Sequence, residues 1–330
     1  MLSGIIYLYN NTNTALLQEK HGFILTFSLK YYKLKIVTNK GRCTMTPQEI
    51  LSKHRLNYSE LRKSSVSYLS DVWLTEKYAI KIYGTNKDGF EKEVWFYYNA
   101  APDYAPAMID CGEDYIILER IYGNSIHRNW HKLSDDMRED YAKQIAEIIT
   151  DITSRGYEDA GHLFPIPDLW EKHIKNRIML LCTELDAGGR IPHGLSLSVR
   201  EFTEEYWQIL EKHEYGLCYS DLRYDNLLAD SNGKVWLLDY ETLCAAPKDF
   251  ILDTFYRMST SPLWDKNEEN AQSSSTLMDL LKKYAPDLFD YPDMDKRIAL
   301  YSLVYELDLL RYYPNDPLAI KNIRDAVENS

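Results

Sequence analysis

Residues 73–121 contain several short apolar runs that are separated by polar turns, a pattern typical of β-strands. The apolar runs 73–74 and 78–83 flank the polar turn Thr75-Glu76-Lys77 and so predict a hairpin. After the break between Gly84 and Gly89, residues 90–98 predict a helix. Two further strands are predicted on either side of Gly112, at residues 107–111 and 115–121. This part of the chain therefore predicts a small antiparallel sheet with one helix.

Beyond Gly123 the apolar spacing changes to three and four, the spacing of amphipathic helices. Ser134 is a candidate N-cap for the first of these, whose apolar positions continue to Ile152. Further helices are predicted at residues 169–185, 198–213, 274–284, 293–312 and 317–327. The change of period divides the chain into a strand-rich region, residues 45–121, and a mainly helical region, residues 122–330.

Residues 1–44 have no clear place in either region. Residues 23–27 and 31–37 have a strand-like pattern, whereas Thr46 and Pro47 form a natural helix start, with Thr46 as the cap. Two alternatives remain open for this N-terminal extension. It is either an added strand pair or a disordered segment that follows an upstream translation start.

Three polar side chains after the helical stretch carry candidate chemistry. Asp221 is followed five residues later by Asn226, and Asp239 follows the apolar run 235–238. The turn Asn232-Gly233 between two apolar runs predicts a hairpin that brings Asn226 and Asp239 to the same end. Transfer of a phosphoryl group from ATP needs a carboxylate facing the acceptor hydroxyl and a hard cation held by oxygen ligands. These residues have the types that such a site requires.

The stretch 218–241 resembles the catalytic segment of the aminoglycoside phosphotransferase and choline kinase-like family, which is related to protein kinases. That family carries His-Gly-Asp-Leu-x-x-x-Asn and then hydrophobic-Ile-Asp-Trp-Glu, and this chain has Asp221, Asn226 and Asp239-Tyr240-Glu241. The segment Asp249 to Asp253 is similar to the family's Asp-Pro-x-x-Asp-Leu. The resemblance implies an α+β, bilobal protein-kinase-like fold with a small antiparallel sheet and one helix in the N-lobe and a larger helical C-lobe.

The resemblance also implies a nucleotide site in the N-lobe. Ala79-Ile80-Lys81 resembles the Val-Ala-Ile-Lys strand, whose lysine holds the α- and β-phosphates. The helix that follows supplies the acid that orients this lysine, and Glu93 is preferred over Glu91 because it precedes an apolar run. By analogy with the family's hinge, Glu119, Arg120 and Ile121 contact the base through their main chain.

By the same resemblance, Asp221 accepts or orients the proton of the acceptor hydroxyl, while Asn226 and Asp239 hold Mg²⁺. Arg223 contacts phosphate or substrate, or else pairs with a nearby acid. The implied function is ATP-dependent phosphoryl transfer to a hydroxyl of a small molecule such as an aminoglycoside, choline, ethanolamine or a sugar. A protein Ser/Thr kinase is the first alternative, but no Ala-Pro-Glu-like anchor follows Asp239. A nucleotide-binding pseudokinase is the second.

Two departures from the family motivate the pseudokinase alternative. Tyr219 stands where the family has His, and our hypothesis is that its ring packs and its hydroxyl donates in place of the imidazole. The expected nucleotide loop, residues 62–71, contains no glycine. Asp253 is interpreted as a brace for the catalytic loop. Glu306 and Asp308 either line an acceptor pocket or lie on a solvated helix face, and we favour the solvated face.

Composition adds limits to this picture. A chain of 330 residues exceeds the size at which single cores stop growing, and it contains no apolar run long enough to span a membrane. The net charge of −12 disfavours nucleic acid or an anionic membrane as a partner and is compatible with a cationic acceptor. Five cysteines without a Cys-x-x-Cys pair, together with a start that lacks a secretory signal, favour the cytoplasm.

Overall fold

The structure, a computed structural model, describes residues 5–8, 14–18, 23–28, 34–38, 45–64, 70–157, 160–219, 226–260 and 268–329. Side chains are described from Met45 onward, apart from those of residues 258–260, 268–272 and 274. The chain divides into two compact units. The first comprises Met1–Val94 and Ala107–Arg120, and the second comprises Trp95–Pro106 and Ile121–Ser330.

The first unit contains a five-stranded antiparallel sheet with the strand order β5-β6-β7-β9-β8. Its strands are β5 (Arg62–Lys63), β6 (Asp71–Leu74), β7 (Tyr78–Ile82), β8 (Met108–Cys111) and β9 (Tyr115–Glu119). The hairpin and the two further strands expected from the sequence are therefore confirmed. Helix α2 (Lys87–Asn99) follows β7, as predicted, and its last residues belong to the second unit.

Helix α1 (Pro47–Lys53) covers part of this sheet. Thr46 caps it in a capping box: the Glu49 backbone N–H donates to Thr46 Oγ1 (3.3 Å), and the Thr46 backbone N–H donates to the Glu49 carboxylate (2.6 Å). Ile50 and Leu51 are fully buried in a core with Ile80 of β7. The helix start predicted at Thr46 and Pro47 is therefore confirmed.

The N-terminal segment contributes a separate antiparallel sheet. Four strands pair in sequence order, namely β1 (Ile5–Leu8), β2 (Thr14–Gln18), β3 (Phe23–Ser28) and β4 (Leu34–Thr38). Strands β3 and β4 fall on the two runs that the sequence marked as strand-like. Strands β1 and β2 were not expected, because their polar and apolar residues follow no clear period.

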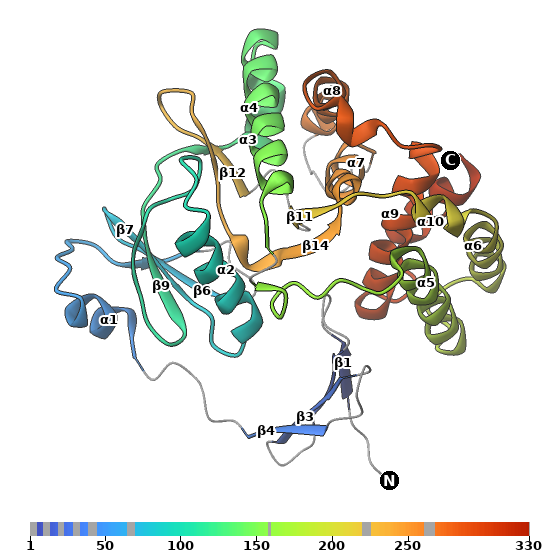
Figure 1. Ribbon diagram of the computed structural model, residues 1–330, viewed down its shortest axis with the longest axis horizontal. Coiled ribbons are helices and arrows are strands. Elements are labelled where there is room, and N and C mark those ends of the chain that lie inside the picture. Colours follow the sequence, from blue (N-terminus) through green and yellow to red (C-terminus); the bar gives the residue numbers. More distant parts are fainter. Residues whose placement is uncertain are drawn as a thin grey trace. The chain divides into compact units, whose positions relative to one another are not determined.

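The second unit is mainly helical (Figure 1). Its helices are α3 (Ile126–Asn129), α4 (Asp135–Ser154), α5 (Trp170–Ala187), α6 (His193–Tyr206), α7 (Leu252–Thr260), α8 (Glu268–Tyr284), α9 (Met294–Tyr312) and α10 (Pro317–Glu328). Its strands are β10 (Asn124–Ser125), β11 (Tyr215–Tyr219), β12 (Leu227–Ala229), β13 (Val235–Leu237) and β14 (Leu243–Pro247). Strand β11 pairs with β14, and β10, β12 and β13 form a three-stranded sheet.

Most helices lie where the apolar spacing placed them, and Ser134 caps α4 as expected by accepting from the Met137 backbone N–H (3.3 Å). The helix predicted at residues 198–213 is displaced. It begins at His193 and ends at Tyr206, where the 3-10 turn η3 (Trp207–Glu211) takes over. Helix α7 was missed. None of the helices in the described residues is both long and apolar enough to cross a membrane.

The core of the second unit joins α5, α6, α9 and α10 (Figure 1). Trp170, at the start of α5, contacts Tyr215, Phe250 and Tyr301 edge to face. Strand β11 lies so close to α4 that a Cβ on Gly216 would stand 2.5 Å from the Thr153 carbonyl oxygen. Only glycine fits at that position without a backbone shift, so β11 is fixed against α4 immediately before the region that carries the candidate chemistry.

Candidate active site

The hairpin expected from the Asn-Gly turn is confirmed. Strands β12 and β13 pair in register from Leu227 opposite Leu237, and the Leu238 backbone N–H donates to the Asn226 carbonyl (2.9 Å). Asn226 therefore lies at the start of one strand and Asp239 follows the end of the other. The sequence brings these two polar side chains to the same end of one hairpin.

Tyr219, the last residue of β11, connects the two arms of this hairpin. Its side chain is fully buried, and its hydroxyl donates toward the Leu238 carbonyl (2.9 Å) and contacts the Asp239 carbonyl. The same hydroxyl accepts from Nδ2 of Asn226 (3.0 Å). The donating hydroxyl in our hypothesis for Tyr219 is therefore present. The structure adds the acceptor role, which fixes the orientation of the Asn226 amide.

Asp239 has a left-handed backbone conformation, with φ 69° and ψ 75°. Such a conformation is uncommon outside glycine and costs about 1–3 kcal/mol, so it persists only where the surroundings enforce it. The next residue, Tyr240, is anchored in the core of the second unit. Its buried ring stacks on Phe96 with centroids 4.0 Å apart, and its hydroxyl donates to the Leu237 carbonyl (2.9 Å).

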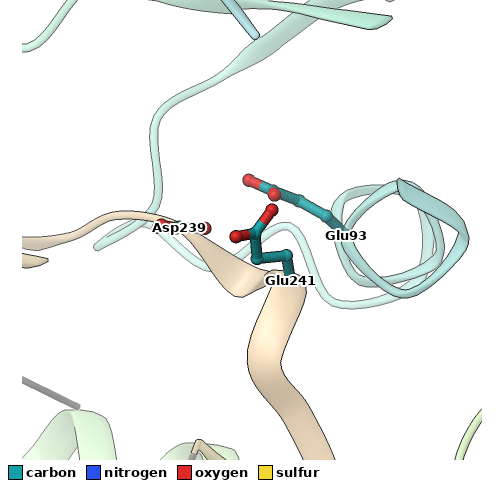
Figure 2. Close-up of side chains that lie close together, drawn as sticks. All are labelled: Glu93, Asp239 and Glu241. Atoms are coloured by element: carbon teal, nitrogen blue, oxygen red, sulfur yellow. The ribbon is translucent and has the colours of Figure 1, made fainter. Parts of the chain in front are cut away.

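Glu241 is a second carboxylate on this turn, which forms the 3-10 helix η5 (Tyr240–Thr242). It is 7% exposed, and one of its carboxylate oxygens lies within 4.8 Å of an Asp239 oxygen. Figure 2 shows Asp239 and Glu241 on the same segment and the side chain of Glu93 on helix α2. Our sequence analysis did not assign Glu241 a ligand role, although the Asp-Tyr-Glu pattern contained the signal.

In the first unit, Lys81 and Glu93 form a buried ion pair. Lys81 Nζ lies 2.7 Å from Glu93 Oε2, with side-chain exposures of 7% and 0%. The hydroxyl of Tyr83 also donates to Glu93 Oε2 (2.5 Å), and its ring lies 4.9 Å from the Lys81 ammonium. The alternative acid, Glu91, pairs with Lys87 on the helix surface instead (3.4 Å). The geometry thus joins Lys81 to Glu93, and their role toward a nucleotide stays a prediction.

Several predicted site residues receive no test from this geometry. Asp221 and Arg223 lie outside the described residues, as do residues 65–69 of the glycine-free loop. Glu119 ends β9 with its side chain exposed, the Arg120 backbone N–H donates to the Lys77 carbonyl (2.9 Å), and Ile121 opens the second unit. Main-chain contact of these three residues with adenine stays a prediction.

The Asp249 to Asp253 segment is braced by buried polar contacts. Asp249 pairs with Arg297 (2.8 Å), both fully buried, and also accepts from the Tyr301 hydroxyl (3.2 Å). Asp253 accepts from Ser302 Oγ (2.6 Å) and pairs with Arg257 (3.1 Å). These contacts tie the segment after β14 to helix α9.

The solvated helix face that we favoured for Glu306 and Asp308 is wrong. Both side chains are buried, at 2% and 6% exposed. Asp308 pairs with Arg177 (2.8 Å), and Glu306 Oε1 accepts from Asn322 (3.0 Å). Burial raises the pKa of Glu306 to about 7. A charged side chain can be buried between helices when side chains of the neighbouring helices pair with it. The apolar periodicity of one helix does not reveal such pairs.

The donor set on the second unit fits a hard divalent cation. The amide oxygen of Asn226 and the carboxylates of Asp239 and Glu241 are all oxygen donors, the class that Mg²⁺ prefers. No sulfur or imidazole ligand accompanies them in the described residues. The residues present therefore fit Mg²⁺ better than a softer metal such as zinc.

The two units, their strand order and the arrangement of hairpin and helices define a protein-kinase-like fold. Comparison with solved structures confirms this class. No protein-family model and no curated protein sequence matches the chain.

Solved structures that resemble the chain include small-molecule phosphotransferases. A gentamicin complex of APH(2")-IIa matches with a TM-score of 0.61 and 16% identity, covering 87% of this chain and 97% of that one. An ADP-bound aminoglycoside phosphotransferase, APH(2'')-Ib, matches with 0.61 and 17%, covering 86% and 96%. The macrolide 2'-phosphotransferase MphH from Brachybacterium faecium matches with 0.57 and 11%, covering 86% and 97%. At these identities the likeness confirms the fold that the resemblance implied.

Proposed function

We propose that the protein is an ATP-dependent phosphotransferase that moves the γ-phosphoryl group of ATP to a hydroxyl of a small molecule. One observation carries this proposal: a single buried hydroxyl, that of Tyr219, bonds both the Asn226 amide and the main chain beside Asp239. Two cation ligands oriented in this way on one hairpin, within a protein-kinase-like fold, are what phosphoryl transfer requires.

In this proposal the oxygens of Asn226 and Asp239 hold Mg²⁺, and Glu241 contributes a further carboxylate beside them. When bound, the cation neutralises charge on the phosphate oxygens. Asp221, two residues after Tyr219, orients the acceptor hydroxyl and accepts its proton. Arg223 pairs with phosphate or substrate oxygens.

Lys81 holds the α- and β-phosphates in this proposal, and its ion pair with Glu93 fixes where the ammonium points. The main chain of Glu119, Arg120 and Ile121 contacts the base. Positioning and electrostatic stabilisation of this kind supply most of the rate enhancement in phosphoryl transfer.

The acceptor that we favour is a small cationic molecule. The gentamicin and streptomycin complexes among the structural relatives support the choice of an aminoglycoside-like acceptor, and the net charge of −12 agrees with it. A protein substrate fits less well, because the sequence after Asp239 turns into η5 and β14 without an Ala-Pro-Glu-like anchor.

The test is ATP consumption against aminoglycosides, choline, ethanolamine, amino sugars and a generic protein substrate, with Asp221→Asn and Asp239→Asn as matched variants. We expect turnover with at least one small hydroxyl compound and a loss of about 100-fold or more in each variant. Asparagine tolerates the left-handed backbone conformation, so the Asp239→Asn variant should remain folded. Equal turnover by parent and Asp221→Asn would refute the assignment of the base. If nucleotide binds without any turnover across the panel, the pseudokinase alternative is favoured instead.

A further inference from the structure

A cavity of the second unit lies away from the hairpin that carries Asn226 and Asp239. It has a volume of about 620 Å³ and is formed by the start of α5, the turn η3 and the start of β11. Tyr215 opens β11 and lines the cavity, whereas Tyr219 ends the strand. Four strand steps of about 3.3 Å separate these residues by roughly 13 Å. The cavity is therefore distinct from the proposed transfer site.

Glu171 is the unusual residue of this cavity. It is only 5% exposed, yet in the described part of the chain its carboxylate has neither a hydrogen-bond nor an ion-pair partner. Other buried acids of the same unit do have partners: Asp249 pairs with Arg297, and Asp308 pairs with Arg177. Neither oxygen of Glu171 belongs to the buried, unpartnered side-chain atoms of the described residues, so the carboxylate faces the cavity and can pair with a cation there.

The walls of the cavity suit an organic cation. Trp170, Trp207 and Tyr215 line it, and Trp207 already takes a cation on its ring, since the Lys175 ammonium lies 4.6 Å from its centroid. Aromatic faces attract ammonium groups in this way. Burial and the nearby Glu171 charge raise the pKa of Tyr215 to about 12, so its hydroxyl stays protonated at neutral pH.

The charged residues around the cavity also favour a cationic ligand. Asp168 and Glu211 line it in addition to Glu171, against one lysine, the exposed Lys172. These carboxylates do not converge enough for a metal ion. Among the described residues, no three acidic, histidine or cysteine ligand atoms at this cavity come within 4.8 Å of one another. An organic ammonium group therefore fits better than a divalent metal.

We propose that this cavity is an ancillary binding site for an organic amine, with the ammonium group against Glu171 and the carbon body against Trp207 and Tyr215. The site is independent of phosphoryl transfer. Its occupancy replaces the missing partner of Glu171 and so stabilises the start of α5, which packs into the core of the second unit.

The test is calorimetric titration of the full chain with ammonium chloride, ethanolamine, choline and spermidine at constant ionic strength. The variant Glu171→Gln removes the charge while keeping the shape, and the control Glu201→Gln removes the same charge from the exposed surface of α6. We expect at least one organic amine to bind more tightly than ammonium, tenfold or more weaker binding in Glu171→Gln, and less than twofold change in Glu201→Gln.

A second variant separates the cavity from the proposed Mg²⁺ site. Asp239→Asn should leave amine binding within twofold of the parent, because Asp239 does not line the cavity. Thermal unfolding of each variant shows whether it is folded. The proposal is overturned if none of the organic amines binds, if Glu171→Gln and Glu201→Gln weaken binding equally, or if Asp239→Asn abolishes binding. None of these outcomes bears on whether the protein transfers phosphoryl groups.

Discussion

Tyr219→Phe removes one oxygen atom and keeps the buried ring. The hydroxyl makes a bond to the Leu238 carbonyl (2.9 Å) and accepts from Asn226 Nδ2 (3.0 Å), so the variant loses both at a position with no solvent access. A buried hydrogen bond contributes about 1 kcal/mol, and an unsatisfied partner costs about 1–3 kcal/mol. We expect the free energy of unfolding to fall by about 2–3 kcal/mol.

Cation-dependent function should be impaired in addition to folding stability. Asn226 is no longer oriented by Tyr219 in the variant, and the main chain at Asp239 loses a contact. We expect the Kd for Mg²⁺ with a non-hydrolysable ATP analogue to rise about tenfold, which corresponds to about 1.4 kcal/mol. Turnover should fall further, since small misplacement of a catalytic group has cost as much as 100-fold in other enzymes.

Tyr240→Phe is the matched control. It also removes one buried tyrosine hydroxyl, which bonds the Leu237 carbonyl (2.9 Å). It should destabilise the chain by about 1–2 kcal/mol but change the Mg²⁺ affinity less than threefold. Urea unfolding and calorimetry measure the two quantities. If both variants shift Mg²⁺ affinity equally, or if Tyr219→Phe shifts only stability, the reasoning about Tyr219 as a positioning residue is refuted.

Three further substitutions probe the fold. Burial raises the pKa of Glu306 from 4.5 to about 7, so the folded chain binds a proton that the unfolded chain releases in that window, and stability falls as pH rises through it. In Glu306→Gln this pH-dependent loss should be absent, so the free energy of unfolding of the variant relative to the parent should rise by about 3 kcal/mol between pH 4.5 and pH 8. Urea unfolding at both pH values measures this difference. The same difference at both pH values would contradict the reasoning. Arg297→Met leaves the Asp249 charge buried without its guanidinium partner, so the free energy of unfolding should fall by about 3–5 kcal/mol. A fall of less than about 1 kcal/mol would contradict this expectation. Gly216→Ala should lower the free energy of unfolding by about 1–3 kcal/mol, because the new Cβ meets the Thr153 carbonyl. The control Gly194→Ala lies on α6 where no atom is close, so it should be neutral or stabilising. Equal shifts of the unfolding temperature in the two variants would argue against the close approach at Gly216.

The sequence predicted those helices and turns whose apolar residues follow a regular spacing or whose ends carry a capping or turn residue. The capping residues Thr46 and Ser134 and the Asn-Gly turn each fix local geometry through bonds within a few residues, so the sequence alone placed α1, α4 and the β12–β13 hairpin. The kinase-like fold followed from the resemblance of the stretch 218–241 to the catalytic segment of a known family.

What was missed depends on contacts between segments far apart in sequence. Glu306 and Asp308 lie on α9, and only neighbouring helices show that partners such as Arg177 allow them to be buried. The bond between Tyr219 and Asn226 needs β11 and the hairpin to meet, so the sequence could suggest a donating hydroxyl but not its acceptor role. Asp221 and Arg223 lie outside the described residues and keep the status of predictions.

The buried hydroxyl of Tyr219 serves both arms of the β12–β13 hairpin at once. It contacts the Leu238 and Asp239 carbonyls on one arm and accepts from the Asn226 amide on the other. Tyr219 is also the last residue of β11. A shift in the position of β11 therefore reaches Asn226 and the main chain of Asp239 together, through a single oxygen atom.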